Sequence, residues 1–105
     1  MRRKLTVRPM AQMDIVKHGV YLIEQQSASA LQFRPSIRSA VSAIKANPRS
    51  YAVLDRQVLP DLELRFCKPA GFKSYLIIFQ VTDDSVVILR VLHASQDIDA
   101  ALRPS

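Results

Sequence analysis

Two apolar segments joined by a short polar turn constrain the fold of this 105-residue chain more than any other feature. Residues 75–81 (YLIIFQV) are apolar at all but one position, and residues 86–93 (VVILRVLH) form a second apolar run that Arg90 interrupts. The intervening TDDS, residues 82–85, has the composition of a hairpin turn. Because the first run is apolar on both faces, we predict a central strand there, with the second run as its antiparallel neighbour.

Shorter patterns predict the remaining elements. Residues 4–8 (KLTVR) and 62–67 (LELRFC) alternate as strands do. Residues 10–26 repeat apolar side chains at the period of a helix, and a second helix should run from Ser29 to about Ala46. Pro35 predicts either a kink in this second helix or a start at the proline, and a short helix is expected over residues 95–102. The side chains predicted to be buried by the two long helices are Met13, Val16, Val20 and Ile23 in the first and Phe33, Ile37, Val41 and Ile44 in the second.

The order of these elements predicts a single domain over residues 1–105 of the α+β class. Strands and helices are segregated, in the order β-α-α-β-β-β with the short helix at the end. A helical hairpin should therefore pack on a largely antiparallel sheet.

Charge and composition bound the compartment and the partners. The net charge of +6 and the pI near 10 favour an acidic partner, although many small basic domains bind none specifically. Cys67 is the only cysteine, so no disulfide can form within the chain, and no cysteine-built zinc site or glycine-rich phosphate loop is present. No apolar run has the length of a signal peptide or a membrane span. We expect a cytoplasmic protein with no cofactor, no bound metal and no membrane contact.

The alternation of side chains along the strands predicts two sheet faces. The face beneath the helices should hold Leu62, Leu64, Phe66, Tyr75, Ile77, Phe79, Val81, Val87, Leu89, Val91 and His93. The opposite face should hold Glu63, Arg65, Cys67, Leu76, Ile78, Gln80, Val86, Ile88, Arg90 and Leu92. With no third layer predicted, the second face would be an exposed apolar stripe bordered by two arginines, which is typical of a partner site.

The charged residues near the end of the chain suggest chemistry but favour a structural role. His93 could act as a general acid or base, yet a hydrogen-bonded histidine at the end of a strand is the commoner case. Arg90 should point to the face opposite His93 unless a bulge intervenes, which disfavours a catalytic pair. Arg65 and Arg90 could bind a phosphate or a carboxylate, or be solvated rim charges. His18 is expected at the surface, and Cys67 has no histidine at a spacing that predicts a thiol nucleophile.

Residues 75–98, YLIIFQVTDDSVVILRVLHASQDI, resemble the carboxy-terminal signature of the RelE/ParE superfamily of toxins from toxin–antitoxin systems. In that signature a tyrosine-led apolar strand, an acidic hairpin turn, an "ILRVLH" strand and an Asp-Ile or Asp-Leu pair follow one another. The earlier elements are compatible, including LELRF at 62–66 as the strand after the helices. The similarity extends over nearly the whole chain, although only the last third is specific.

The resemblance implies one of two activities. RelE-like members cleave messenger RNA on the ribosome, using basic residues of the sheet and an aromatic residue or histidine near the C-terminus; here these would be Arg65, Arg90 and His93. ParE-like members inhibit DNA gyrase by binding it. The ending RVLH…DI is more similar to the ParE branch, and Arg103 is the only base after His93. Gln96 stands where the family often has an arginine.

We therefore expect a ParE-like toxin that is not an enzyme, inhibits gyrase and is neutralised by a cognate antitoxin. The alternatives are a RelE-like ribosome-dependent endoribonuclease and a toxin relative that has lost its activity. By analogy, the antitoxin is a small DNA-binding protein whose arm lies over the toxin, so that operator DNA is contacted only through it. The residues predicted to bind that arm are Arg65, Leu76, Ile78, Val86, Ile88, Arg90 and Leu92.

Overall fold

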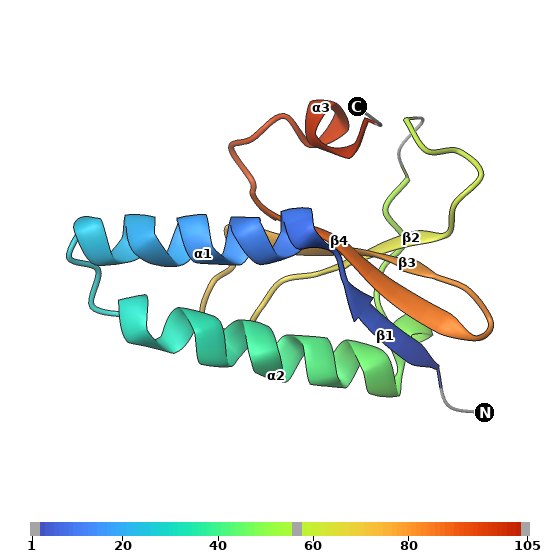
Figure 1. Ribbon diagram of the computed structural model, residues 1–105, viewed down its shortest axis with the longest axis horizontal. Helices are drawn as coiled ribbons and strands as arrows, with labels where there is room; N and C mark the ends of the chain where they lie inside the picture. The colour runs from blue at the N-terminus through green and yellow to red at the C-terminus, as the bar shows by residue number, and fades with distance from the viewer. Residues whose placement is uncertain (1–2, 56–57, 104–105) are drawn as a thin grey trace.

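The computed structural model of the protein describes residues 3–55 and 58–103, and it has the α+β architecture that the sequence predicts (Figure 1). Its elements are β1 (Lys4–Val7), α1 (Pro9–Glu24), α2 (Phe33–Ala46), β2 (Leu64–Cys67), β3 (Tyr75–Val81), β4 (Ser85–His93) and α3 (Ile98–Leu102). The two long helices lie side by side and antiparallel, so the predicted helical hairpin is confirmed. Among the described residues, no helix combines the length and the hydropathy needed to cross a membrane.

The four strands form one sheet in the order β1-β4-β3-β2. β4 pairs with β3 and β3 with β2 in antiparallel fashion, whereas β1 runs parallel to β4, with Lys4 opposite Ser85 and Val7 opposite Ile88. The sheet is therefore largely antiparallel, as predicted. Because β1 covers only the first half of β4, no described strand lies beside the second half of β4 on that edge.

A bulge in β4 changes which side chains face the helices. Ile78 pairs with Arg90 but Phe79 pairs with Ile88, so Leu89 is an extra residue with no partner in β3. An extra residue reverses the alternation of side chains on one side of the bulge. Val86 and Ile88 consequently lie on the helix side, whereas Leu89 lies on the other. The predicted alternation is correct from Arg90 onward and wrong before it.

β2 also faces opposite to the prediction. Leu64 and Phe66, with Leu62 just before them, pack on the side away from the helices, and Cys67 packs beneath the helices. The pairing of Cys67 with Ile77 and of Leu64 with Gln80 fixes this orientation. When layers cover both sides of a sheet, either face of a short strand can pack against apolar side chains. The alternation of β2 alone therefore does not determine which of its faces turns toward the helices.

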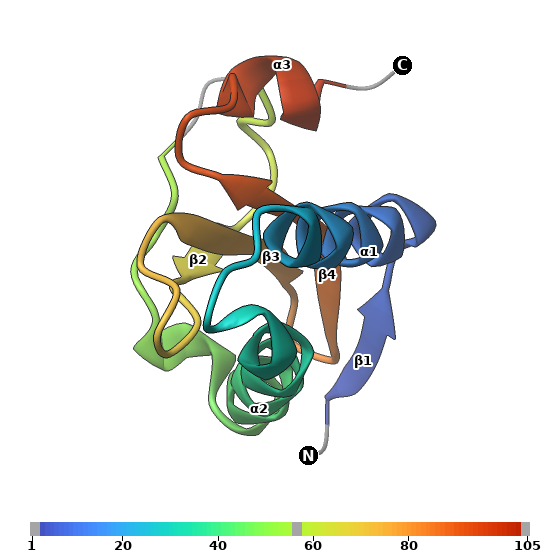
Figure 2. The same ribbon diagram turned by 90° about the vertical axis from the view of Figure 1, so that its left-hand side faces the viewer.

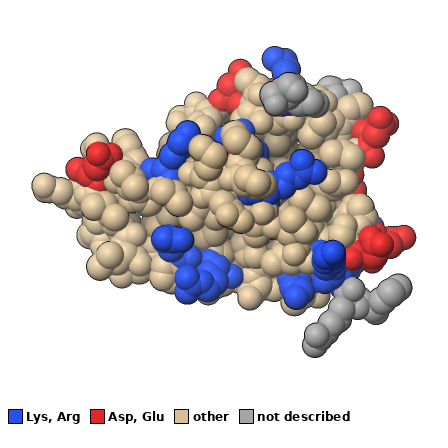
Figure 3. All heavy atoms as spheres, in the orientation of Figure 1, with Lys and Arg blue, Asp and Glu red and all other residues tan. Residues whose placement is uncertain are grey.

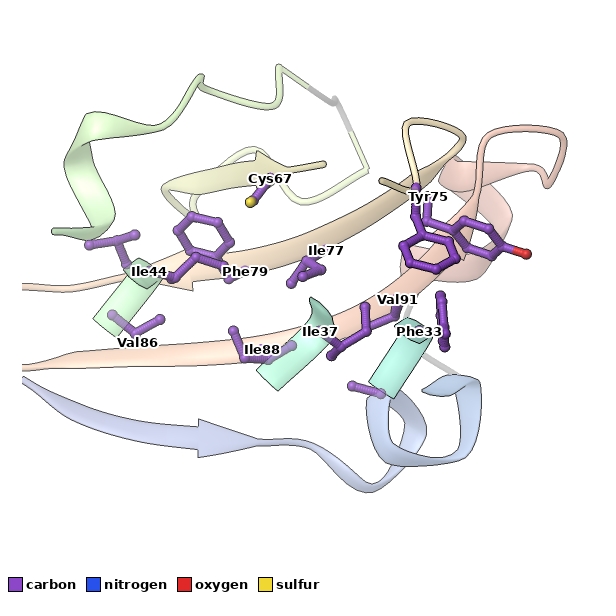
Figure 4. Close-up of a cluster of buried hydrophobic side chains, with 13 residues drawn as sticks. Phe33, Ile37, Ile44, Cys67, Tyr75, Ile77, Phe79, Val86, Ile88 and Val91 are labelled. Atoms are coloured by element: carbon purple, nitrogen blue, oxygen red, sulfur yellow. The ribbon is translucent and has the colours of Figure 1, made fainter. Parts of the chain in front are cut away.

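The helix side of the sheet holds the larger core. Aromatic and aliphatic side chains of β3 and β4 meet those of α2 there, as Figure 4 shows. Phe33 lies against Phe72 and Tyr75 with the ring centroids 5.1 Å apart in both pairs, in edge-to-face arrangements. Fully buried aromatic side chains dominate the apolar area of such a core. The principal members of this cluster are Ala11, Phe33, Ile37, Ile44, Cys67, Tyr75, Ile77, Phe79, Val86, Ile88 and Val91.

α2 buries the face that the sequence predicts. Phe33, Ile37 and Ile44 are at most 3% exposed. Pro35 lies in the first turn of the helix, where backbone N–H groups have no carbonyl partner within the helix. The proline therefore removes no hydrogen bond there and does not break the helix. The outward side carries Arg34, Arg38 and Lys45, and Figure 3 shows Lys and Arg side chains along the lower edge of the molecule, over α2.

α1 turns the predicted core stripe toward solvent. Met13, Val16, Val20 and Ile23 are 48–60% exposed. The helix instead buries Ala11 and Asp14, with Ile15 and Leu22 partly buried beside them. α1 is apolar on two opposite sides, and in such a helix the period alone does not identify the inward side.

The opposite face of the sheet is covered, which corrects the prediction of an exposed apolar stripe. Leu64, Leu76, Ile78 and Leu92 form a second buried cluster with Leu102 of α3. Side chains of the loop before β2 complete it: Leu54, Val58, Leu59 and Leu62. Figure 2 shows α3 on one side of the sheet and α2 on the other. The five-residue α3 and an irregular loop thus supply the third layer that the sequence pattern did not predict.

Leu102→Asp tests whether α3 is part of the fold. Leu102 is 7% exposed, and its loss should lower the free energy of unfolding by about 2–5 kcal/mol, with increased binding of an apolar dye as Leu76 and Leu92 become accessible. The measurement is urea unfolding beside dye fluorescence. Leu31→Asp is the matched control, because Leu31 is 82% exposed and the change should remain within about 0.5 kcal/mol. Equal effects of the two substitutions would contradict the assignment.

Candidate functional site

Arg90 is the centre of a buried polar cluster that joins three elements. Its Nε lies 2.7 Å from Oδ2 of Asp14 and its Nη2 lies 2.8 Å from Oδ1, which is the bidentate arrangement of a guanidinium on a carboxylate. Its Nη1 donates to the carbonyl oxygen of Ala101 at 3.0 Å. The side chains of Arg90 and Asp14 are 16% and 8% exposed. The hydrogen bonds to Asp14 raise the pKa of Arg90, so the guanidinium stays protonated.

Asp14 and His18 occupy the edge of β4 beyond the end of β1. The amide of Val91 donates to Oδ2 of Asp14 at 3.0 Å, and Nε2–H of His18 donates to the carbonyl oxygen of Val91 at 2.8 Å. The two side chains stand one helical turn apart on the same side of α1. They therefore satisfy both backbone groups of Val91 as a neighbouring strand would.

Neither of these roles was recognised from the sequence. His18 was expected at the surface, but it is half-buried and contacts Tyr75 edge-on with the ring centroids 5.0 Å apart. The available signal was the recurrence of Ala11, Asp14, His18 and Leu22 on one side of a helix whose other side is apolar. A small residue and an aspartate on the same side of a helix are as compatible with close packing against the polar edge of a strand as with exposure to solvent.

Arg65 is held by two residues that precede its strand. Its Nε donates to Oε2 of Glu63 at 2.9 Å, and its Nη1 donates to the carbonyl oxygen of Tyr51 at 2.6 Å. Arg49 contacts the same carboxylate at 3.0 Å and reaches Asp83 at 3.2 Å. Hydrogen bonds lower the pKa of Glu63 from 4.5 to about 2, and those from Arg49 contribute more than the one from Arg65. Arg65 therefore contacts a carboxylate of its own chain, and with a side chain that is 17% exposed it is not a solvated rim charge.

His93 lies at the mouth of a small cavity on the helix side. The cavity measures about 230 Å³ and is lined by His18, Tyr21, Tyr75, His93 and Ser95. Nδ1 of His93 accepts from the amide of Ser95 at 3.1 Å and lies 2.7 Å from its hydroxyl, while the amide of His93 donates to Gln96. These bonds fold the chain back after β4, which is the structural role expected for a histidine at the end of a strand.

The residues of the RelE-like alternative do not converge. Arg90 pairs with Ile78 and faces α3, whereas His93 pairs with Tyr75 and faces the helices, so the predicted separation of these two is observed. Arg65 shares the helix-side face of Cys67 but lies on β2, which β3 separates from the β4 residues Arg90 and His93. Burial raises the pKa of the Cys67 thiol, which disfavours a reactive thiolate. Within residues 3–55 and 58–103, no cluster of three His, Cys, Asp or Glu side chains could hold a metal ion.

The residues predicted to contact an antitoxin are mostly inaccessible in this structure. Leu76 is 9% exposed, and Ile78, Val86, Ile88 and Leu92 are fully buried. They also divide between the two faces, with Val86 and Ile88 beneath the helices. Contact of an antitoxin with these residues stays a prediction, and it would require α3 and the loop before β2, or the helices, to move aside.

Arg90→Ala should destabilise the fold strongly, because it leaves the carboxylate of Asp14 buried without its cation. We expect the free energy of unfolding to fall by about 3–5 kcal/mol, measured by urea unfolding at neutral pH. Arg34→Ala, at an exposed arginine with no charged partner among the described residues, is the control and should change little. A stability of Arg90→Ala close to that of the control would mean that the pair is open in solution.

Glu63→Gln should act in a pH-dependent way. The depressed pKa keeps the folded carboxylate ionised, so its contribution is fully present above about pH 4.5 and fades as the pH falls toward about 2. The side chain is 31% exposed, which limits this contribution to about 1 kcal/mol or less. Melting curves of both proteins across this range should differ most near neutral pH and converge in acid. A difference that does not change with pH would contradict the ion-pair network.

Comparison with known proteins identifies the family of this chain. A family model described as "ParE toxin of type II toxin-antitoxin system, parDE" matches residues 5–98. Among solved structures, a chain of "Chromosomal ParDE TA system from P. aeruginosa" is similar with a TM-score of 0.68 and 17% identity, covering 88% of this chain and 96% of that chain. At this identity the structural likeness supports the fold alone. No curated protein matches the chain significantly. The family match nevertheless spans most of the chain, and the protein therefore belongs to the ParE toxin family of type II toxin–antitoxin systems.

Proposed function

We propose that this ParE-type toxin acts by binding and inhibiting DNA gyrase and that a cognate antitoxin neutralises it. The observation that carries the proposal is the engagement of both sheet arginines within the fold. Arg90 is held by Asp14 and Ala101, and Arg65 by Glu63 and Tyr51. Neither guanidinium is presented to a phosphate backbone, which favours an interaction protein over a nuclease.

The chemistry of RNA cleavage strengthens this preference. Cleavage requires a group that takes the proton of the 2′-hydroxyl and cations that stabilise the charged transition state at the same phosphate. His93 could supply the first, but Arg90 faces the opposite side of the sheet and is neutralised by a carboxylate. A nuclease would have to break the Asp14–Arg90 pair to recruit this cation.

The exposed side of α1 supports a protein target. Met13, Val16, Val20 and Ile23 are about half exposed and follow one another along about three turns of the helix. Consecutive exposed apolar side chains on one helix face are typical of a protein interaction site. The same proposal places the toxin in the cytoplasm, with operator DNA contacted only through the antitoxin.

The proposal predicts inhibition of gyrase with no cleavage of RNA. Purified toxin added to gyrase and relaxed plasmid should reduce supercoiling or accumulate cleaved complexes, and toxin added to translating ribosomes should leave messenger RNA intact. Val16→Asp should weaken gyrase inhibition by more than about tenfold, because it places a charge in the apolar stripe. Lys73→Glu, an exposed change in the turn before β3, is the control.

Two outcomes would reject this function. Codon-dependent cuts in ribosome-bound messenger RNA would support the RelE-like alternative instead. Full gyrase activity at toxin concentrations that still arrest growth would point to another target. Restoration of growth by the product of the small reading frame next to the toxin gene would separately identify the antitoxin.

A further inference from the structure

We propose that a groove between β1, α1 and α2 receives an acidic amphipathic segment of the antitoxin, an inference that rests on the proposed function. The groove measures about 430 Å³. The residues predicted to bind the antitoxin do not line it, and the apolar ones among them, Leu76, Ile78, Val86, Ile88 and Leu92, are buried in the two cores. It is therefore accessible without any rearrangement of the fold.

The floor of the groove is aliphatic. Leu5 and Val7 contribute from β1, Ile15 from α1, and Ile37 and Val41 from α2. Leu5, Val7, Ile15 and Val41 are half-buried and pack against the main core, so they present fixed apolar surface at its boundary. β1 is an edge strand of the sheet, and one side of it is not covered by another described strand. Such a floor suits a segment that buries a few aliphatic side chains.

The wall formed by α2 is cationic. Arg34, Arg38 and Lys45 line the groove and are exposed. Their spacing of four and seven residues places all three on one side of the helix. None of the three has an ion-pair partner among the described residues, and the residues lining the groove include no Asp or Glu.

This charge arrangement selects the occupant. Three unpaired cations beside an apolar floor attract a segment that carries carboxylates next to aliphatic side chains, and they disfavour a basic one. The exposed stripe of α1 differs in this respect, because Lys17 and Glu24 of the same helix have opposite charges. The groove therefore carries a sign preference that the α1 stripe lacks, and the two surfaces can be separated by mutation.

The test is a titration with the purified product of the small reading frame adjacent to the toxin gene. Arg34→Glu/Arg38→Glu should weaken binding by more than about tenfold, because two attractive contacts become repulsive. Lys17→Glu/Lys73→Glu changes the net charge by the same amount at exposed sites outside the groove and should bind within about threefold of wild type. Added salt should weaken wild-type binding more than binding of the groove variant.

A second pair of variants tests the apolar floor. Val41→Asp should weaken binding, whereas Val16→Asp, on the α1 stripe, should not. Circular dichroism and melting curves establish that each variant is folded, and the Arg34/Arg38 variant decides the outcome if Val41→Asp unfolds. Wild-type affinity in the Arg34/Arg38 variant, or equal losses in it and in the Lys17/Lys73 variant, would overturn the groove while leaving the antitoxin in place. No binding by the wild-type toxin would instead reject both the groove and this antitoxin.

Discussion

The carboxylate of Asp14 is the point on which the arrangement of helices and sheet depends. It accepts two hydrogen bonds from the guanidinium of Arg90 and one from the amide of Val91, and its side chain is 8% exposed. A carboxylate at such depth needs hydrogen bonds to both of its oxygens and a cation that balances its charge. Because Arg90 also holds Ala101, this one contact determines where α1 lies on β4 and where α3 lies on the sheet.

The distribution of apolar surface follows from these positions. With α3 held against the sheet, the face of Leu76, Ile78 and Leu92 is a core instead of a binding surface. With α1 held by a polar contact at the edge of β4, its inward side needs few large side chains and its apolar stripe remains outside. The surfaces left for partners are thus on the helices and the β1 edge, whereas the sequence pattern placed them on the sheet.

The sequence predicts the class, the order of elements and the hairpin of β3 and β4 because long apolar runs, turns and helical periods are local signals. It predicts the burial of Phe33, Ile37 and Ile44 for the same reason. The faces of β2 and of the first half of β4 were wrong, because the extra residue Leu89 and the pairing of Cys67 are set by neighbouring strands. The partners of Arg90 were missed because Asp14 is 76 residues away, and no local pattern joins the two.

At Val91, two side chains of α1 take the place of a neighbouring strand. The hydrogen bonds of this residue therefore depend on the position of the helix layer. Its amide is bonded to a carboxylate and its carbonyl to an imidazole, both carried by α1. A movement of α1 away from the sheet would therefore free the amide and the carbonyl of this one residue while the amides between β3 and β4 keep their backbone partners. Hydrogen exchange at Val91 consequently measures the opening of the helix layer separately from the unfolding of the sheet.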